Sequence, residues 1–341
     1  MNKVVLALAG VVVLGAAGGA FWVKKQRDDY EKWRFAKIEM SENIARLPAN
    51  WSAQTLASRL EKSKKVRESG AFEEAAQEIG LQTIAAGAYA LPQTASPRDL
   101  AQIFKAGPTH ASVTFPEGFT GLQMARRLAR NGFAGAKDFE NRVYPAQGAS
   151  PHEGFLFPST YFLPLKASGR DLIGTLNDEW RERTRELRGP FPSVKGRPIS
   201  LRELTIIASL VEREAVSAAE MPLVARVILN RLNEPMRLQI DATIQYARVL
   251  EGSGHTPRLL YADLKIDSPF NSYKNDGLPP TPICNPGMDA LRAAAKPAKS
   301  DALFYVFSPK LKRHRFSRGY DEFLKNKRLA KNEREALSGA S

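Results

Sequence analysis

The segment Leu201–Asp241 constrains the fold most strongly, because a carboxylate interrupts its apolar helical pattern. Apolar side chains recur at the three- and four-residue spacings of one packed helix face: Leu204, Ile207, Leu210 and Val211. Glu214 occupies the next position on that face, near the C-terminal end of the expected helix. Loss of solvation and the negative end of the helix dipole both raise the pKa of a carboxyl group placed there. The segment therefore predicts a glutamate that stays protonated near neutral pH, as a general acid must.

The neighbouring Glu212 is predicted to project from a different side of this helix. There it shares a stripe of small and polar side chains: Thr205, Ala208 and Ser209. Because this stripe and the packed face differ in polarity, we expect Glu212 and Glu214 to have opposite environments. We interpret Glu212 as a structural or supporting residue, and a direct catalytic role is the less favoured alternative.

The chain after Glu214 predicts a second helix and a short strand. Residues 217–220 read Ser-Ala-Ala-Glu, the form of a capping box, although Pro222 also suits a helix that starts at Met221. The helical pattern then continues through Leu223, Val224, Val227, Ile228 and Arg231. The sequence MRLQID (residues 236–241) alternates apolar and polar side chains, which predicts a strand with Gln239 and Asp241 on one side.

Length and charge limit the class of protein and its partners. With 341 residues, the chain is long enough for two domains and appendages. Its net charge of +14 suggests an anionic partner: nucleic acid, a membrane surface or an acidic wall polymer. Nucleic acid is the least favoured of these, because aromatic side chains are not interleaved with the basic residues. A single cysteine, Cys284, excludes an intrachain disulfide. Four scattered histidines, without HExxH or paired CxxC motifs, argue against a metal site, and no cofactor is expected.

The N-terminal run Val4–Val23 is apolar, rich in glycine and alanine, and about as long as a helix that crosses a bilayer. It predicts a transmembrane anchor over residues 1–23, followed by a charged juxtamembrane stalk over residues 24–47. A signal peptide cleaved near Ala20 is the alternative, but the run exceeds the usual apolar region of such a peptide. The positive-inside rule would place the Lys24 end of the run in the cytoplasm.

Two α+β domains are predicted after the stalk. Residues 48–110 contain helix patterns around Leu56, behind a Ser52 cap, and around Phe72. A strand-like AAGAYAL segment and a helix that Ser96 caps follow, and together these patterns predict a compact module or spacer domain. Residues 111–328 hold the Glu214 helix and the aromatic-rich HEGFLFPSTYFLP segment, and they predict the larger domain. The last residues, 329–341, are expected to form a flexible tail.

The loop Ser268–Gly287 is too long and too rich in proline for a simple connection, and such loops tend to be functional. Side chains that can hydrogen-bond sugars occur in this loop and in the MRLQID segment: Gln239, Asp241, Asn271, Tyr273 and Asn285. Each of them alone is explained as readily by a turn or by a satisfied buried polar group. Their accumulation is what predicts a binding site.

Five sequence blocks resemble the YceG-like family, the endolytic murein transglycosylases. The blocks are ASLVEREA, the NRL that precedes MRLQID, GLPPTPICNPG followed by ALRAAAKPA, HEGFLFPSTY and the closing HRFS. The resemblance covers nearly the whole chain. It implies an α+β protein with an N-terminal transmembrane helix, a small LysM-like domain and a larger catalytic domain.

The resemblance also implies roles for individual residues. The catalytic glutamate of the family is the second of a Glu-x-Glu pair, which is Glu214 in this chain. Further substrate-binding candidates are Glu153, Glu212 and Thr243. The chain departs from the family pattern at Ala215, where Thr is common, at Ala242, where Pro is usual, and at Thr281, where Gly is usual. None of these changes removes the acid, but Ala215 lacks a hydroxyl that could orient the substrate.

The activity implied is cleavage of the β-1,4 bond between N-acetylmuramic acid and N-acetylglucosamine, without water, to give 1,6-anhydromuramoyl ends. The resemblance implies a catalytic domain on the outer side of the bacterial inner membrane, opposite to the charge rule. Peptidoglycan strands are the expected substrate, and peptidoglycan synthases are candidate partners. Two alternatives stay open: a lysozyme-like muramidase, and a non-catalytic wall-binding scaffold that recruits synthases.

Overall fold

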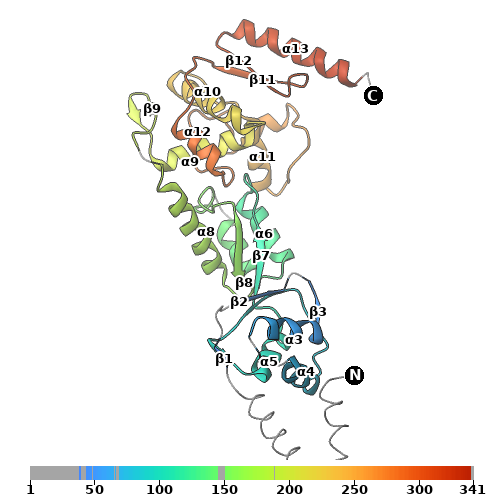
Figure 1. Ribbon diagram of the computed structural model, residues 1–341. Coiled ribbons are helices and arrows are strands. Elements are labelled where there is room, and N and C mark those ends of the chain that lie inside the picture. Colours follow the sequence, from blue (N-terminus) through green and yellow to red (C-terminus); the bar gives the residue numbers. More distant parts are fainter. Residues whose placement is uncertain are drawn as a thin grey trace, which may run out of the picture. The chain divides into compact units, whose positions relative to one another are not determined.

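The computed structural model describes residues 38–39, 44–47, 49–64, 66, 69–144, 150–187 and 189–338. Contacts divide the chain into two compact units. The first includes the described residues up to Ser112 together with Phe162–Leu165, and the second comprises Val113–Tyr161 and the chain from Lys166 onward. Helices and several small sheets occur in the described residues, which confirms the predicted α+β class (Figure 1).

The predicted transmembrane anchor, Val4–Val23, lies outside the described residues. Within the part of the chain that the structure describes, no helix is both long enough and apolar enough to cross a membrane. Most of the predicted stalk also lies outside the described residues. Its end differs from the prediction, because Ile44–Leu47 forms strand β2, which pairs antiparallel with β5.

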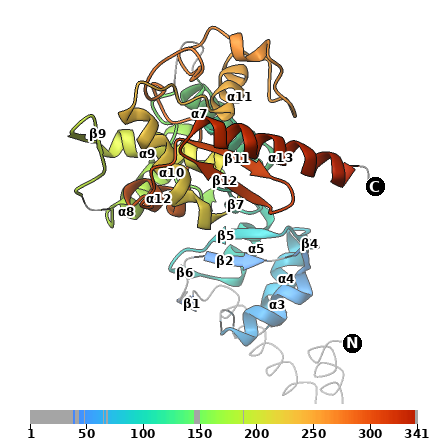
Figure 2. The ribbon, with the colours of Figure 1, turned by 90° about the horizontal axis from the view of Figure 1, so that it is seen from above.

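In its described residues, the first unit combines three helices with short strands (Figure 2). Its helices are α3 (Ala53–Lys62), α4 (Ser69–Glu78) and α5 (Pro97–Lys105). Its short strands are β1 (Ile38–Glu39), β2 (Ile44–Leu47), β3 (Trp51–Ser52), β4 (Thr83–Ile84), β5 (Gly87–Ala90) and β6 (Thr94–Ala95). A four-stranded sheet has the order β2-β5-β7-β8, and the unit boundary falls within β7 (His110–Thr114) and β8 (Thr160–Pro164).

The predicted local signals of this unit are confirmed. Ser52 caps α3 by accepting the Thr55 N–H at 3.1 Å, and Ser96 forms a capping box in front of Pro97. The core contains fully buried aromatic side chains from α4, β5 and α5: Phe72, Tyr89 and Phe104. The unit is therefore a packed α+β module, as expected, and its likeness to a LysM domain stays a prediction.

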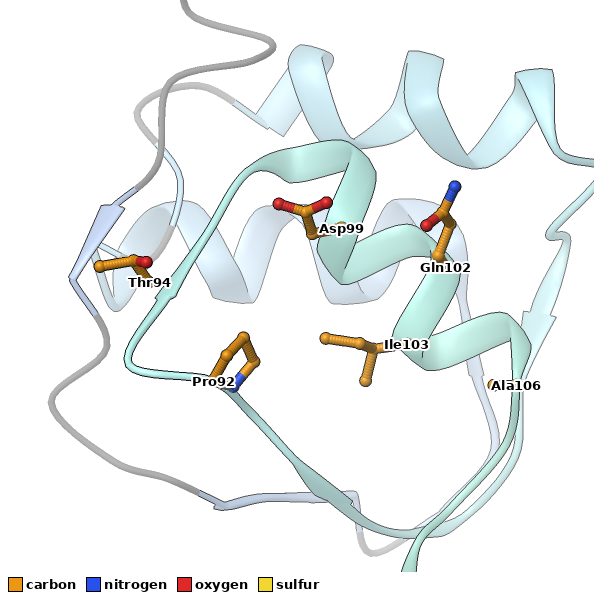
Figure 3. A pocket seen from close by; sticks show the side chains of 6 residues that line it. All are labelled: Pro92, Thr94, Asp99, Gln102, Ile103 and Ala106. Carbon is orange, nitrogen blue, oxygen red and sulfur yellow. The ribbon is translucent and has the colours of Figure 1, made fainter.

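An open depression lies on the first unit, between the segment around β6 and one side of α5. It is lined by Pro92, Thr94, Asp99, Gln102, Ile103 and Ala106 (Figure 3). None of the predicted site residues is among them. The candidate site must therefore be sought in the second unit, where those residues lie.

The second unit is mainly helical. Its α-helices are α6 (Gly121–Arg130), α7 (Ala136–Val143), α8 (Gly169–Thr184), α9 (Leu201–Glu214), α10 (Met221–Asn233), α11 (Asp241–Leu250), α12 (Met288–Ala295) and α13 (Tyr320–Ser338), and its 3-10 helices are η1 (Ala218–Glu220) and η2 (Asp263–Lys265). Its hairpins pair β9 (Ser193–Val194) with β10 (Arg197–Pro198) and β11 (Phe304–Ser308) with β12 (Arg313–Ser317).

Helix α9 is the central helix of this unit. Ser200 and Glu203 close a capping box at its start, and α10, α11 and α12 pack around it (Figure 1). The eight residues Leu204–Val211 are all buried, including the stripe with Thr205 and Ser209. The expectation of one packed and one more polar face was therefore wrong. A helix surrounded by other helices buries its polar stripe too, and Ser209 uses its hydroxyl to bond the loop at Ile283 N–H (3.1 Å).

Two other expectations for this region were wrong, namely the capping box and the strand. Ser217 makes no side-chain cap, because the Glu220 carboxylate instead bonds His314, and α10 begins at Met221, the alternative start that Pro222 suggested. The MRLQID segment is not a strand. Gln239 has a φ of +51°, and the backbone groups around it bond side chains and a loop, with Ile240 N–H donating to the Ser272 hydroxyl at 2.9 Å.

Helix α13 covers one face of the β11–β12 hairpin (Figure 2). Phe304 of β11 stacks on Phe323 of α13, with ring centroids 5.1 Å apart. Arg315 of β12 pairs with Glu333 of α13 at 2.8 Å. The tail expected from residue 329 is therefore helical as far as Ser338, because these contacts hold it against the hairpin.

Candidate active site

Glu214 is the last residue of α9, and its side chain is half-buried. One carboxyl oxygen, Oε2, accepts a hydrogen bond from the Tyr305 hydroxyl at 2.8 Å. Burial and the nearby Asp241 carboxylate raise the pKa of Glu214, the Tyr305 hydrogen bond opposes the shift, and the resulting pKa is about 7. Both protonation states are therefore populated near neutral pH, which is the property that the sequence pattern predicted for this residue.

Two predicted residues lie beside this glutamate. Asp241, the exposed first residue of α11, is close enough to affect the pKa of Glu214, and the backbone N–H of Ala242 donates to the Glu214 carboxyl group. The Tyr273 hydroxyl donates to Asp241 Oδ1. Burial and this bond both raise the pKa of Tyr273, so the phenol stays protonated. The structure thus assembles an acid, a second carboxylate and a hydroxyl donor.

Arg231 is a member of the cluster that sequence reasoning did not single out. Its side chain is 9% exposed, and its Nε donates to the carbonyl oxygen of Leu303 at 2.6 Å. A second guanidinium nitrogen donates to the carbonyl oxygen of Leu238. Burial lowers the pKa of Arg231, and Glu214 acts in the opposite direction. Arg231 therefore supplies the positive charge near two carboxylates and ties α10 to the segments that carry Tyr305 and Asp241.

Glu212 has a separate environment from Glu214, although both are half-buried. Its Oε2 accepts the backbone N–H of Gly287 at 3.0 Å, at the start of α12. Burial raises the pKa of Glu212 as well. The predicted contrast between a buried and a solvated glutamate was therefore wrong. Both carboxyl groups lose solvation, because neighbouring helices enclose the end of α9 on both sides.

Glu153 and Asn285 form a second carboxyl cluster inside the unit. Glu153 is 3% exposed and accepts hydrogen bonds from Asn285 Nδ2 (2.9 Å), the Tyr246 hydroxyl (3.2 Å) and the Gly121 N–H (3.1 Å). Asn285 is fully buried, and its Oδ1 accepts the Gly154 N–H at 2.9 Å. These two predicted binding residues are brought together, but their polar atoms are occupied within the interior.

The other predicted binding residues are divided between interior and surface. Thr243 is fully buried and bonds the Ile240 carbonyl oxygen at 2.7 Å. Asn271 is also fully buried, and its Nδ2 donates to two backbone carbonyl oxygens, including that of Ile266 at 2.8 Å. Gln239 is exposed, and its backbone has a left-handed conformation two residues before Asp241. Of these residues, Asp241 and Tyr273 therefore combine some exposure with a place beside Glu214, and Gln239 is an exposed neighbour of Asp241 in the chain.

In the described ranges, no group of three or more His, Cys, Asp and Glu side chains is arranged to hold a metal ion. Cys284 is buried, and its Sγ donates to the Ser209 carbonyl oxygen at 3.4 Å. Burial raises its pKa well above the ordinary value, so the thiol is not an activated nucleophile. The chemistry available at the site is that of Glu214 and the hydroxyl and carboxylate groups around it.

The chain is similar to known proteins over most of its length. The model of the YceG-like family matches residues 45–329. An endolytic murein transglycosylase of Bacillus subtilis is 31% identical over 330 residues, covering 87% of this chain and 88% of that protein. An endolytic murein transglycosylase of Streptococcus pneumoniae is 29% identical over 295 residues, covering 76% of this chain and 53% of that protein, so the chain spans about half of its length.

A solved structure supports the same assignment. The crystal structure of a putative YceG-like protein from Listeria monocytogenes aligns with a TM-score of 0.52 and 27% sequence identity, covering 85% of this chain and 99% of that chain. The family match includes both the Glu214 cluster and the Glu153 cluster. The chain therefore belongs to the YceG-like family.

Proposed function

We propose that this protein is an endolytic murein transglycosylase, which cleaves peptidoglycan strands internally with Glu214 as its catalytic acid. The single observation that carries the proposal is the half-buried Glu214, whose pKa of about 7 keeps a large share of it protonated at neutral pH. Its relatives in Bacillus subtilis and Streptococcus pneumoniae bear this name. A carboxylic acid of this kind is what protonation of a glycosidic oxygen requires.

The first step breaks the β-1,4 bond between N-acetylmuramic acid and N-acetylglucosamine. Neutral Glu214 donates its proton to the glycosidic oxygen while the bond from that oxygen to C1 of muramic acid breaks. Positive charge then develops at C1, and the Asp241 carboxylate near Glu214 stabilises it electrostatically. Gln239 and Tyr273 provide hydrogen-bonding groups at the same surface for the sugar hydroxyls.

The second step closes a ring on the substrate. Glu214, now a carboxylate, accepts the proton of the C6 hydroxyl of the same muramic acid, and the freed oxygen bonds to C1. The product is a 1,6-anhydromuramoyl end, no water is consumed, and Glu214 regains its proton. Most glycosidases need two carboxyl groups for acid and nucleophile or base. Here the nucleophile belongs to the substrate, so one acid serves both steps.

The same proposal includes the cellular setting. The Val4–Val23 run anchors the chain in the inner membrane with the catalytic unit on its outer side, where strands are made. The small unit is a LysM-like domain close to the glycan, and peptidoglycan synthases are its candidate partners. Cleavage near the membrane would end the elongation of nascent strands.

A muramidase is the second candidate, and Asp241 is the observation that favours it. Ordinary glycoside hydrolysis uses two carboxyl groups near each other, and Glu214 and Asp241 form such a pair. Water would then attack C1, and the products would have reducing ends. The C6 hydroxyl would take no part.

Digestion of purified glycan strands in H₂¹⁸O tests the proposal. The full-length chain, in detergent, is compared with Glu214→Gln, and the products are read by mass spectrometry. Internal fragments that end in anhydromuramic acid and contain no ¹⁸O, absent for Glu214→Gln, support the proposal. Reducing ends labelled with ¹⁸O would replace it with hydrolysis. Strand binding without cleavage by either protein would identify a wall-binding scaffold instead.

A further inference from the structure

A side chain far away in the sequence contacts the Glu214 carboxyl group: that of Tyr305, which 91 residues separate from Glu214. Its hydroxyl donates to Glu214 Oε2 at 2.8 Å. Burial raises the pKa of Tyr305 well above its ordinary value, and the neighbouring Glu214 raises it further. The phenol therefore stays protonated around neutral pH and acts as a hydrogen-bond donor there.

Helix α10 holds the β11–β12 hairpin that carries Tyr305 at two points. In its last turn, Arg231 donates from Nε to the carbonyl oxygen of Leu303, just before β11, at 2.6 Å. Before its first turn, the buried Glu220 accepts the backbone N–H of His314 at 2.7 Å and bonds the His314 Nδ1 at 2.8 Å. These hydrogen bonds are partly buried, and they fix the hairpin to α10, which packs against the helix α9 that carries Glu214.

The packing inside the hairpin orients the Tyr305 ring. Tyr305 lies opposite Phe316 in the antiparallel register, and Phe307 lies opposite His314. The Tyr305 ring contacts the His314 ring edge-on, with centroids 5.2 Å apart, and lies 6.1 Å from the Phe316 ring. Tyr305, Phe307, His314 and Phe316 thus place four aromatic rings on one face of the hairpin. Their contacts fix the Tyr305 ring with its hydroxyl toward Glu214.

The reaction proposed above makes two demands on Glu214. The carboxyl group must first present a proton to the glycosidic oxygen and must then persist as a carboxylate until the C6 hydroxyl gives up its proton. A donor fixed on one oxygen stabilises that carboxylate and stops the group from turning away between the two steps. The Ala242 N–H is a second donor to the same group, but it belongs to the start of α11 and not to the hairpin.

We propose that Tyr305 is a positioning residue of this enzyme: its hydroxyl holds the Glu214 carboxyl group in its working orientation and stabilises the ionised intermediate state of that group. The inference rests on the proposed function. The hairpin, anchored by Arg231 and Glu220, is the element that places the hydroxyl. Tyr305 acts through its hydrogen bond to Glu214 and does not need to touch the sugar.

The variant Tyr305→Phe removes the hydroxyl and keeps the ring. We expect kcat for the release of anhydro-ended fragments to fall about ten- to a hundred-fold, with little change in KM, because a hydrogen bond to a charged group is lost. Wild-type activity falls as pH rises through about 7, when Glu214 loses its proton. Without the Tyr305 bond the pKa of Glu214 rises, so this fall moves to higher pH. The other groups that act on Glu214, namely Asp241, Arg231 and Tyr273, are unchanged.

The control is Tyr161→Phe, which removes another buried hydroxyl that donates to the Phe157 carbonyl oxygen at 2.6 Å. It should lower thermal stability without moving the pH profile. Circular dichroism establishes that Tyr305→Phe is folded. If folded Tyr305→Phe has the wild-type kcat and pH profile, the inference is wrong while the proposed function stands. If the wild type gives no anhydro-ended product, the proposed function itself fails.

Discussion

Two glutamates in the second unit invite comparison, because each accepts a hydrogen bond from a tyrosine and each has a raised pKa. Glu153 bonds Tyr246, and burial raises the pKa of Glu153 to about 8. Glu214 bonds Tyr305, and burial raises the pKa of Glu214 to about 7. A raised pKa and a tyrosine partner therefore do not by themselves distinguish a catalytic acid from an interior polar group.

The difference lies in what surrounds each carboxyl group. Glu153 is 3% exposed and is enclosed by donors from three parts of the chain, including Asn285 Nδ2. Glu214 keeps some exposure and adjoins the exposed Asp241. Glu214 is therefore the more exposed of the two residues. This difference in exposure distinguishes the two clusters, and the following predictions test that distinction.

The largest expected effect is on catalysis by Glu214→Gln. The amide keeps the shape of the side chain but cannot donate a proton as an acid, so formation of anhydro-ended fragments should fall about 10²- to 10⁴-fold. The unfolding free energy at pH 8 should not fall, because the variant no longer buries a charge there. Product analysis and urea unfolding measure the two quantities. A variant with more than a tenth of wild-type activity would contradict the comparison.

Glu153→Gln should instead change the pH dependence of stability. The folded-state pKa of Glu153, about 8, exceeds the ordinary value of 4.5, so the folded protein binds more protons than the unfolded chain between these values. The contribution of Glu153 to the unfolding free energy is therefore fully present below about pH 4.5. It falls by up to about 1.4 kcal/mol per pH unit as the pH rises toward 8. Urea unfolding at pH 5.5, 7 and 8.5 should give a shallower dependence for Glu153→Gln, and parallel curves would disprove the role.

Asn285→Ala should destabilise the second unit without a specific effect on chemistry. It leaves two buried N–H groups, of Gly154 and Leu156, without their partner and removes the amide that donates to Glu153, at a cost of about 2–4 kcal/mol. The matched control is Asn275→Ala, an exposed asparagine whose Nδ2 donates to the Ser268 and Asn271 carbonyl oxygens. The control should cost less than about 1 kcal/mol. Equal midpoints of thermal unfolding for the two variants would refute the assignment.

The smallest effect is expected for Tyr246→Phe. Loss of the hydroxyl that donates to Glu153 at 3.2 Å should cost about 1 kcal/mol of stability. The same loss should raise the pKa of Glu153, because this hydrogen bond favours the ionised form. Its kcat should stay within about two-fold of the wild type, unlike that of Tyr305→Phe. An equal loss of kcat in both tyrosine variants would mean that the two clusters are not distinct.

The sequence was most informative where short-range patterns decide the structure. The position of Glu214 on an apolar helix face followed from spacing alone, and the capped helices α3 and α5 began where Ser52 and Ser96 indicated. The environment of Glu212 could not be predicted, because an amphipathic pattern does not reveal that α12 also covers the other side of α9. Such enclosure depends on segments far away in the chain.

Two members of the Glu214 cluster illustrate the same limit. Arg231 could have been predicted, because it lies four residues after Val227 and three after Ile228 on the packed face of α10. A charged side chain thus interrupts an apolar helix face, which is the pattern that marked Glu214. Tyr305 had no such signal, because an aromatic residue in a strand is ordinary. The strand predicted for MRLQID was wrong. The carbonyl oxygen of Leu238, which would bond a neighbouring strand in a sheet, instead accepts a hydrogen bond from Arg231.

The dependence of Glu214 on the β11–β12 hairpin has a consequence for synthesis of the protein. The ribosome makes Glu214 well before Tyr305, and His314, which Glu220 holds, comes later still. A nascent chain that already contains the acid therefore lacks the element that positions it. Under the proposed role of Tyr305, a chain that ends before the hairpin is thus expected to be inactive although it contains Glu214.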